Sequence, residues 1–171
     1  MKTTKNLGQQ IRIWHQELTD KYICELRHCK HLPQIWINPA FVDLCSRLQD
    51  IDIKNEWAIH YPDYIDELKE NQNVDLITGL FVHLTQNQHK DGIEITTEMK
   101  NKKNGRYPIV NGTRFRQLLS FHDKDRLFDL LISILRYHRN FTFDLEIFAR
   151  DLFFWNDAVK RKWALNYYSD T

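Results

Sequence analysis

Apolar residues recur at helical intervals along most of this chain, and that periodicity restricts the fold more than any other feature. Leu7, Ile11, Trp14 and Leu18 are four, three and four residues apart, so they share one face of a helix. Only five glycines and four prolines occur in 171 residues, whereas all-β folds need many turns. The sequence therefore predicts an all-α fold, and a hydrophobic content of 42% is enough to build its core.

Local start signals mark further helices. Asn38 followed by Pro39 predicts a helix start, because Asn caps helices and Pro suits the first helical position. Asn111 and Asp123 are expected to cap two later helices. Apolar stripes predict helices near 7–18, 22–28, 41–48, 74–88, 115–119, 127–135, 145–155 and 159–167. We count about eight helices and no convincing strand, and the pattern leaves the acidic stretch 51–75 ambiguous.

The polar and basic segment 89–112 holds three of the five glycines and is the longest candidate loop. Loops of this length are usually functional or mobile rather than passive connections. We therefore predict two small helical bundles joined by a basic loop. The expected division is an N-terminal bundle over 1–90, a linker over 91–112 and a C-terminal bundle over 113–171.

The net charge of +1 conceals an asymmetry along the chain. Residues 51–75 carry seven acids against two lysines, which leaves a local charge of −5. Residues 100–139 carry ten cations against three acids, which leaves +7. A local positive charge of this size attracts polyanions whatever the total charge, although ordinary surface charge is the alternative explanation.

Several classes of protein are disfavoured by missing features. Three cysteines form no disulfide framework, and the N-terminal residues lack the apolar stretch of a secretory signal. No run of about 18 uncharged apolar residues is present to span a membrane. We expect a cytoplasmic protein with reduced thiols and no membrane contact.

Cys24, His28, Cys29 and His31 are ligand-type residues within eight positions. Structural zinc sites need a second pair of ligands elsewhere in the chain, and none is evident. Buried helical thiols are the expected role, so we predict no metal and no cofactor.

His122-Asp123 is an HD dipeptide, which metal-dependent HD phosphohydrolases use. The remaining ligands of such a site would come from His83 or His89 and from Asp144 or Asp151. Capping of a helix explains Asp123 equally well, and no phosphate-binding or hydrolase motif accompanies it. We expect a protein that is not an enzyme and has no catalytic residues, and an HD-type phosphohydrolase stays the alternative.

The arginines of the C-terminal half coincide with helical signals. Arg114 and Arg116 flank Phe115, which belongs to an apolar stripe, so their side chains leave that stripe. Arg126 and Arg136 lie away from the leucine face of the next helix. Because phosphate binding needs only cations on a rigid frame, this arrangement favours contact with a nucleic-acid backbone.

Three motifs in this region resemble one known family. They are T-R-F-R-Q-L-L from Thr113, D-R-L-x-x-L-L from Asp125 and F-W-x-x-x-V-K-R-K-W-A-x-x-Y-Y from Phe154. Together they resemble the small subunit of the type I-E CRISPR Cascade complex, the CasB family. Residues 25–28 and 38–41 resemble the E-L-R-R … P-A-F segment of that family, with His28 in place of its second arginine, and 11–14 resembles its first helix. The resemblance is specific over 111–168, moderate over 25–45 and poor over 50–110.

The resemblance implies an all-helical, non-catalytic subunit that serves antiviral defence. Two copies would line the inside of the complex, next to the CasC backbone and the CasA large subunit. Their basic faces would hold the separated DNA strands while the guide RNA pairs with its target. Base pairing would then read the sequence, and this protein would stabilise the R-loop through RNA-binding and DNA-binding contacts to the backbone.

Ten cations are the candidate nucleic-acid-binding residues, and three near the C-terminus are a candidate subunit contact. The first set is Arg27, Lys30, Lys100, Lys102, Lys103, Arg114, Arg116, Arg126, Arg136 and Arg139. The second set is Lys160, Arg161 and Lys162. A helical protein-interaction adaptor without nucleic-acid binding is a further alternative.

Overall fold

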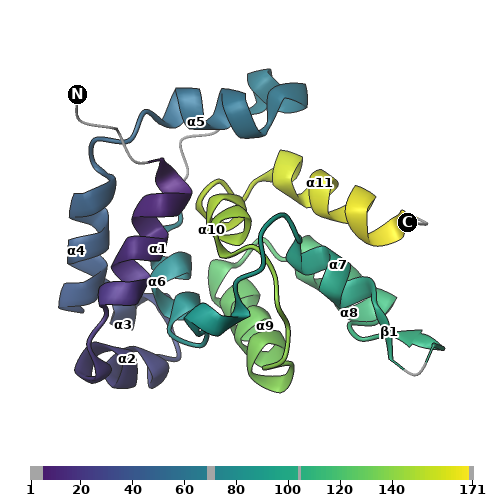
Figure 1. Ribbon diagram of the computed structural model, residues 1–171, viewed down its shortest axis with the longest axis horizontal. Helices are drawn as coiled ribbons and strands as arrows, with labels where there is room; N and C mark the ends of the chain where they lie inside the picture. The colour runs from purple at the N-terminus through teal and green to yellow at the C-terminus, as the bar shows by residue number, and fades with distance from the viewer. Residues whose placement is uncertain (1–5, 69–71, 104, 170–171) are drawn as a thin grey trace.

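The computed structural model describes residues 6–68, 72–103 and 105–169, without the side chain of Lys103, and confirms the all-α fold (Figure 1). The helices of the first half are α1 (Leu7–Glu17), α2 (Asp20–Arg27), α3 (Leu32–Trp36), α4 (Pro39–Leu48), α5 (Ile53–His60) and α6 (Val74–Phe81). Those of the second half are α7 (Ile95–Lys100), α8 (Gly112–Ser120), α9 (Lys124–Tyr137), α10 (Leu145–Phe153) and α11 (Asp157–Tyr168). Short 3-10 turns, η1 (Pro62–Glu67) and η2 (Gln86–Gln88), follow α5 and α6.

Several helices begin at the residues that the sequence predicts, and each of these starts is capped by a side chain. The Asn38 side chain accepts a hydrogen bond from the Ala40 N–H at the start of α4. Asn111 caps α8 in the same way, and the Asp123 carboxylate caps α9. Each cap satisfies a backbone donor that has no partner within the helix, so the three predicted starts are confirmed.

The predicted loop 89–112 contains regular structure. Helix α7 forms there because Ile95 and Met99, four residues apart, are buried where α7 packs against α11. The two-residue strands β1 (Lys102–Lys103) and β2 (Tyr107–Pro108) then pair antiparallel. The number of helices also exceeds the predicted eight, since α3, α5 and α7 were not foreseen as separate elements.

Helix α6 ends at Phe81, earlier than the predicted 88. All eight of its residues are buried, and it contacts α2, α3, α4, α9 and α10. Beyond Phe81 the chain turns into η2, where the Thr85 N–H donates to the Gln88 side chain. In this turn His83 is half-buried between the core residues Val82 and Leu84.

The two halves of the chain share one continuous hydrophobic cluster. Helix α1 lies against α10, and Gly8 permits this close approach because a Cβ there would stand 2.8 Å from Glu146 Cβ. In Figure 1, α1 to α4 lie on one side, α7, α8 and α11 on the other, and α9 and α10 between them. The division at 91–112 stays a prediction.

The C-terminal helix confirms the predicted apolar stripe. Val159, Trp163 and Tyr167 are buried on one face of α11. Trp163 packs edge-on against Trp155, and Tyr167 stacks on Phe115 of α8. Within the described chain, no helix combines the length and apolar character needed to cross a bilayer.

Candidate nucleic-acid interface

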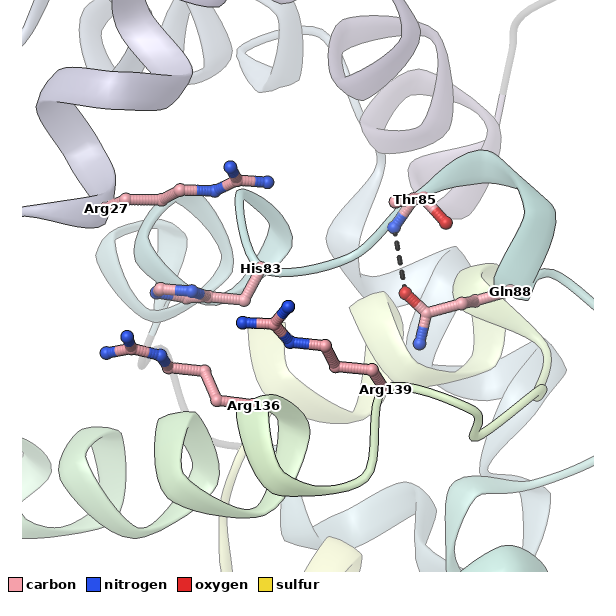
Figure 2. A pocket seen from close by; sticks show the side chains of 6 residues that line it. All are labelled: Arg27, His83, Thr85, Gln88, Arg136 and Arg139. Atoms are coloured by element: carbon pink, nitrogen blue, oxygen red, sulfur yellow. Dashed lines mark hydrogen bonds between the residues drawn. The ribbon is translucent and has the colours of Figure 1, made fainter.

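Three arginines from two distant parts of the chain converge on one cavity. Arg27 is the last residue of α2, Arg136 lies in the last turn of α9, and Arg139 follows that helix. With His83, Thr85 and Gln88 they line a cavity of about 370 Å³. Figure 2 shows Arg27 on one side of His83 and Arg136 and Arg139 on the other. We call this group of six residues the arginine pocket.

The frame of the arginine pocket is held by backbone contacts. Arg27 donates through Nε to the Val82 carbonyl oxygen at 2.9 Å, which leaves its terminal nitrogens for other acceptors. Gln88 is buried and donates through Nε2 to the Phe141 carbonyl at 3.0 Å. These contacts join α2, the turn after α6 and the segment after α9. The pocket is therefore a product of tertiary packing.

The arginine pocket is positively charged and lacks acids. None of its six residues is acidic, and its three guanidinium groups form no ion pair with any described carboxylate. Burial, together with the charges of Arg136, Arg27 and Arg139, lowers the pKa of His83 to about 4. His83 is therefore neutral at pH 7. An anion in the cavity would relieve the repulsion among the three cations.

The candidate cations of α7, β1 and α8 lie outside the arginine pocket. Arg114 donates through Nη2 to Ser133 Oγ at 2.6 Å, and the Arg116 side chain is exposed beside Thr113. Lys100 donates through Nζ to the Asn166 carbonyl and to Ser169. Lys100 and Lys102 line a second, open hollow with Gly112 and Tyr168. The side chain of Lys103 lies outside the described part of the chain.

Two further candidates are exposed and belong to neither hollow. Lys30 lies in the turn after α2, and Arg126 lies in the first turn of α9. Neither forms an ion pair with an acid of the described chain, and both side chains are exposed, so both charges face solvent. The structure therefore brings three of the ten candidates, Arg27, Arg136 and Arg139, into one cavity.

The three terminal cations differ in environment. Lys162 pairs with Asp151 at 2.9 Å and with Glu94 at 3.0 Å. Burial acts to lower the pKa of Lys162, but these two carboxylates outweigh it and raise that pKa above its usual value. Arg161 pairs with Glu67, whereas Lys160 is half-buried without an ion pair in the described chain. Of the three, Lys160 has the charge most available to a partner.

The HD dipeptide does not assemble a metal site among the described residues. The Asp123 carboxylate accepts from the Asp125 N–H, as expected of a cap, and His122 is exposed. The described chain has one group of potential metal ligands, His89, Asp144 and Glu146. The guanidinium of Arg12 lies 3.2 Å from Glu146 and 3.4 Å from His89, so a cation already occupies that group.

Two expectations from the sequence need correction or extension. The sequence predicts buried helical thiols, but Cys24 is exposed on α2 and Cys29 is half-buried beyond the end of that helix. The sequence indicates His83 only as a possible metal ligand, whereas it lines the arginine pocket. No periodicity or motif singles out His83, since the residues around it come from three separate segments.

Residues 25–168, which include the end of α2, all of α3 to α11 and the whole arginine pocket, match the family model described as CRISPR-associated protein Cse2. Comparisons with curated proteins and with solved structures gave no match.

Proposed function

Because this chain belongs to the CRISPR-associated Cse2 family, the small subunits of type I-E Cascade, we propose that it holds nucleic-acid backbone within that complex. The proposed role is non-catalytic. The protein stabilises the R-loop while guide RNA pairs with the target, and it works beside the backbone subunits, the large subunit and a second copy of itself.

The observation that carries this proposal is the convergence of Arg27, Arg136 and Arg139 on one cavity without an acid. Elsewhere in the described chain, arginines such as Arg47 are neutralised by nearby carboxylates. Clustered cations repel one another, and a phosphate offers oxygen acceptors that satisfy guanidinium donors from several directions. The arginine pocket thus supports binding of a phosphate-bearing partner.

Phosphate contacts position a nucleic acid without reading its bases. The proposed contacts are therefore independent of sequence, as a subunit that holds strands for a guide RNA requires. Arg114, Arg116 and Lys102, together with Lys100, extend the proposed contact beyond the arginine pocket, and the side chain of Lys103 lies outside the described part of the chain. Lys30 and Arg126 add exposed positive charge.

The test is salt-dependent binding of duplex DNA by the purified protein. If three to five phosphates are contacted, a plot of log K against log salt is expected to slope about −3 to −4.5. The Arg27→Gln/Arg136→Gln/Arg139→Gln variant should bind more weakly and give a slope less steep by about 2 to 3. A flat salt response of the parent protein would rule out the phosphate-binding role and favour the adaptor alternative.

Arg47→Gln is the matched control, since it removes one positive charge from a residue already paired with Glu17 and Asp43. Its salt slope should equal that of the parent. If Arg47→Gln and the single variants of the arginine pocket lose the same affinity for DNA, net charge, and not the pocket, determines binding.

Assembly is tested separately, by co-purification with the other Cascade subunits and a guide RNA. Lys160 and Arg161 are the proposed subunit contact, together with the internally paired Lys162. Recovery of the arginine-pocket variant in the complex, with reduced R-loop stability, would distinguish the strand-holding role from an assembly role.

A further inference from the structure

His83 is the one neutral titratable group in the wall of the arginine pocket. Its Nε2 atom is buried and has no hydrogen-bond partner among the described residues. In Figure 2 its ring lies between the side chains of Arg27 and Arg136. A buried polar atom without a partner costs free energy, so this atom is poised to bind a group that enters the cavity.

The charged groups around His83 come from each element packed against it. Arg27 faces it from α2, Arg136 from α9, and Arg139 from the segment after α9. Thr85 and Gln88, on the η2 side, are neutral. Neither His28 nor His138 lines this pocket: His28 donates through Nδ1 to the Cys24 carbonyl, and His138 stacks on Phe141. No carboxylate within the described chain contributes to the electrostatics of His83.

We propose that His83 is a fourth ligand of a phosphate group in the arginine pocket and that it takes up a proton when the phosphate binds. This inference rests on the proposed phosphate-binding function and adds the residue that makes binding depend on pH. The phosphate belongs to a nucleic-acid strand, either as a backbone diester or as a terminal monoester.

The proton balance follows from charge. In the free protein, burial and the three guanidinium groups both oppose a fourth positive charge, so the imidazole is neutral. A bound phosphate compensates those charges and accepts a hydrogen bond from the protonated ring, which stabilises the imidazolium. Below the pKa of His83 in the complex, one proton therefore passes from solvent to His83 for each phosphate bound. Affinity must then rise as pH falls through the pKa of His83 in the complex.

Binding of a thymidine-only oligonucleotide with a 5′-hydroxyl provides the main test, since its bases and diesters do not titrate in this range. If the complex restores the pKa of His83 to about 6.5, the parent should bind about tenfold more tightly at pH 5.5 than at pH 7.5. In His83→Gln the ratio of the two affinities should fall below about twofold, because glutamine cannot take up a proton. His122→Gln, which changes an exposed histidine outside the arginine pocket, should keep the parental ratio.

The same oligonucleotide with a 5′-phosphate distinguishes the source of the ligand. Tighter binding than the 5′-hydroxyl form, again lost in His83→Gln, would identify a terminal phosphate. Equal binding of the two forms, with the pH response intact, would identify the backbone diester. Either result supports the proposed site.

Nuclear magnetic resonance of the parent protein gives a test that does not depend on the folding of a variant. The imidazole of His83 should titrate near pH 4 in the free protein and at least one pH unit higher with saturating sulfate. An unchanged pKa with bound sulfate, or a parental pH response in a folded His83→Gln protein, would overturn the role of His83 and leave the proposed function standing. Absence of oligonucleotide binding by the parent at both pH values would overturn the proposed function itself.

Discussion

Lys162 Nζ lies 2.9 and 3.0 Å from the two carboxylate oxygens of Asp151, and this ion pair joins α11 to α10. The Asp151 side chain is 3% exposed and that of Lys162 is 25% exposed. Asp151 also accepts hydrogen bonds from the Tyr61 hydroxyl at 2.6 Å and from Trp163 Nε1 at 2.8 Å. One buried carboxylate thus connects the segment after α5 with the last two helices.

We predict that Asp151→Ala destabilises the protein by about 3–5 kcal/mol, because it leaves Lys162 with fewer partners and two buried donors with none. Lys162→Met should lower the free energy of unfolding by less, since Asp151 keeps its hydrogen bonds from Tyr61 and Trp163. Urea denaturation of both variants measures the difference. Equal free energies of unfolding would mean that the ion pair alone, and not the network, stabilises this region.

Trp163→Ala should cost about 3–5 kcal/mol, because it empties a buried aromatic site in the C-terminal core. Trp163→Phe is the companion variant, which keeps an aromatic ring but loses the hydrogen bond to Asp151. The melting temperature of Trp163→Phe should lie between those of the parent and of Trp163→Ala. A Trp163→Ala protein that melts like the parent would contradict the packing described here.

Gly79→Ala should destabilise the fold by about 1–3 kcal/mol through overpacking. A Cβ at Gly79 would stand 2.5 Å from atoms of both Ile35 and Phe128, so α6 could not keep its place between α3 and α9. Gly112→Ala is the control, since its Cβ would meet only the flexible Arg116 side chain at 3.5 Å. If both variants unfold at the same urea concentration, close packing around Gly79 does not make a side chain at this position destabilising.

Stability in the absence of anions should decrease from pH 7.5 to pH 5. The pKa of His83 is about 4 in the folded protein and 6.5 when unfolded, so the unfolded state binds the proton first as pH falls. The contribution of His83 is thus present above pH 6.5 and is lost as pH falls toward 4. After allowance for solvent screening, the loss at pH 5 should be on the order of 1 kcal/mol.

His83→Gln should lack this part of the pH dependence, and added sulfate should reduce it in the parent. Denaturation curves at several pH values, with and without sulfate, compare the two proteins. An identical pH profile for parent and variant would show that His83 does not contribute to it.

Arg114→Ala/Arg116→Ala should weaken nucleic-acid binding and R-loop stability while the fold survives, because Arg116 is exposed and the half-buried Arg114 gives up one hydrogen bond, to Ser133, and no ion pair of the described chain. Charge reversal in Lys160→Glu/Arg161→Glu should instead impair assembly with partner subunits. Melting curves, salt-dependent DNA binding and co-purification are needed for both double variants. Normal DNA binding by a well-folded Arg114→Ala/Arg116→Ala protein would remove α8 from the proposed contact surface.

Local signals in the sequence were sufficient for most of the helices. Asn38, Asn111 and Asp123 cap the helices that they were expected to cap, because a cap is made by a side chain and a backbone donor two or three residues away. The stripe of Val159, Trp163 and Tyr167 is buried as predicted, since a helical period assigns one face before any partner is known. The family also follows from contiguous motifs.

The tertiary structure alone decided where the cations meet. Arg27 and Arg136 are 109 positions apart in the sequence, and only the packing of α2 and α9 around α6 brings both to His83. The sequence likewise does not predict that Lys162 pairs with Asp151 and Glu94, because a lysine in a sequence does not indicate which carboxylates lie near it in the fold. Short-range periodicity determines which residues form helices, whereas the field at a site depends on distances between helices that no local pattern encodes.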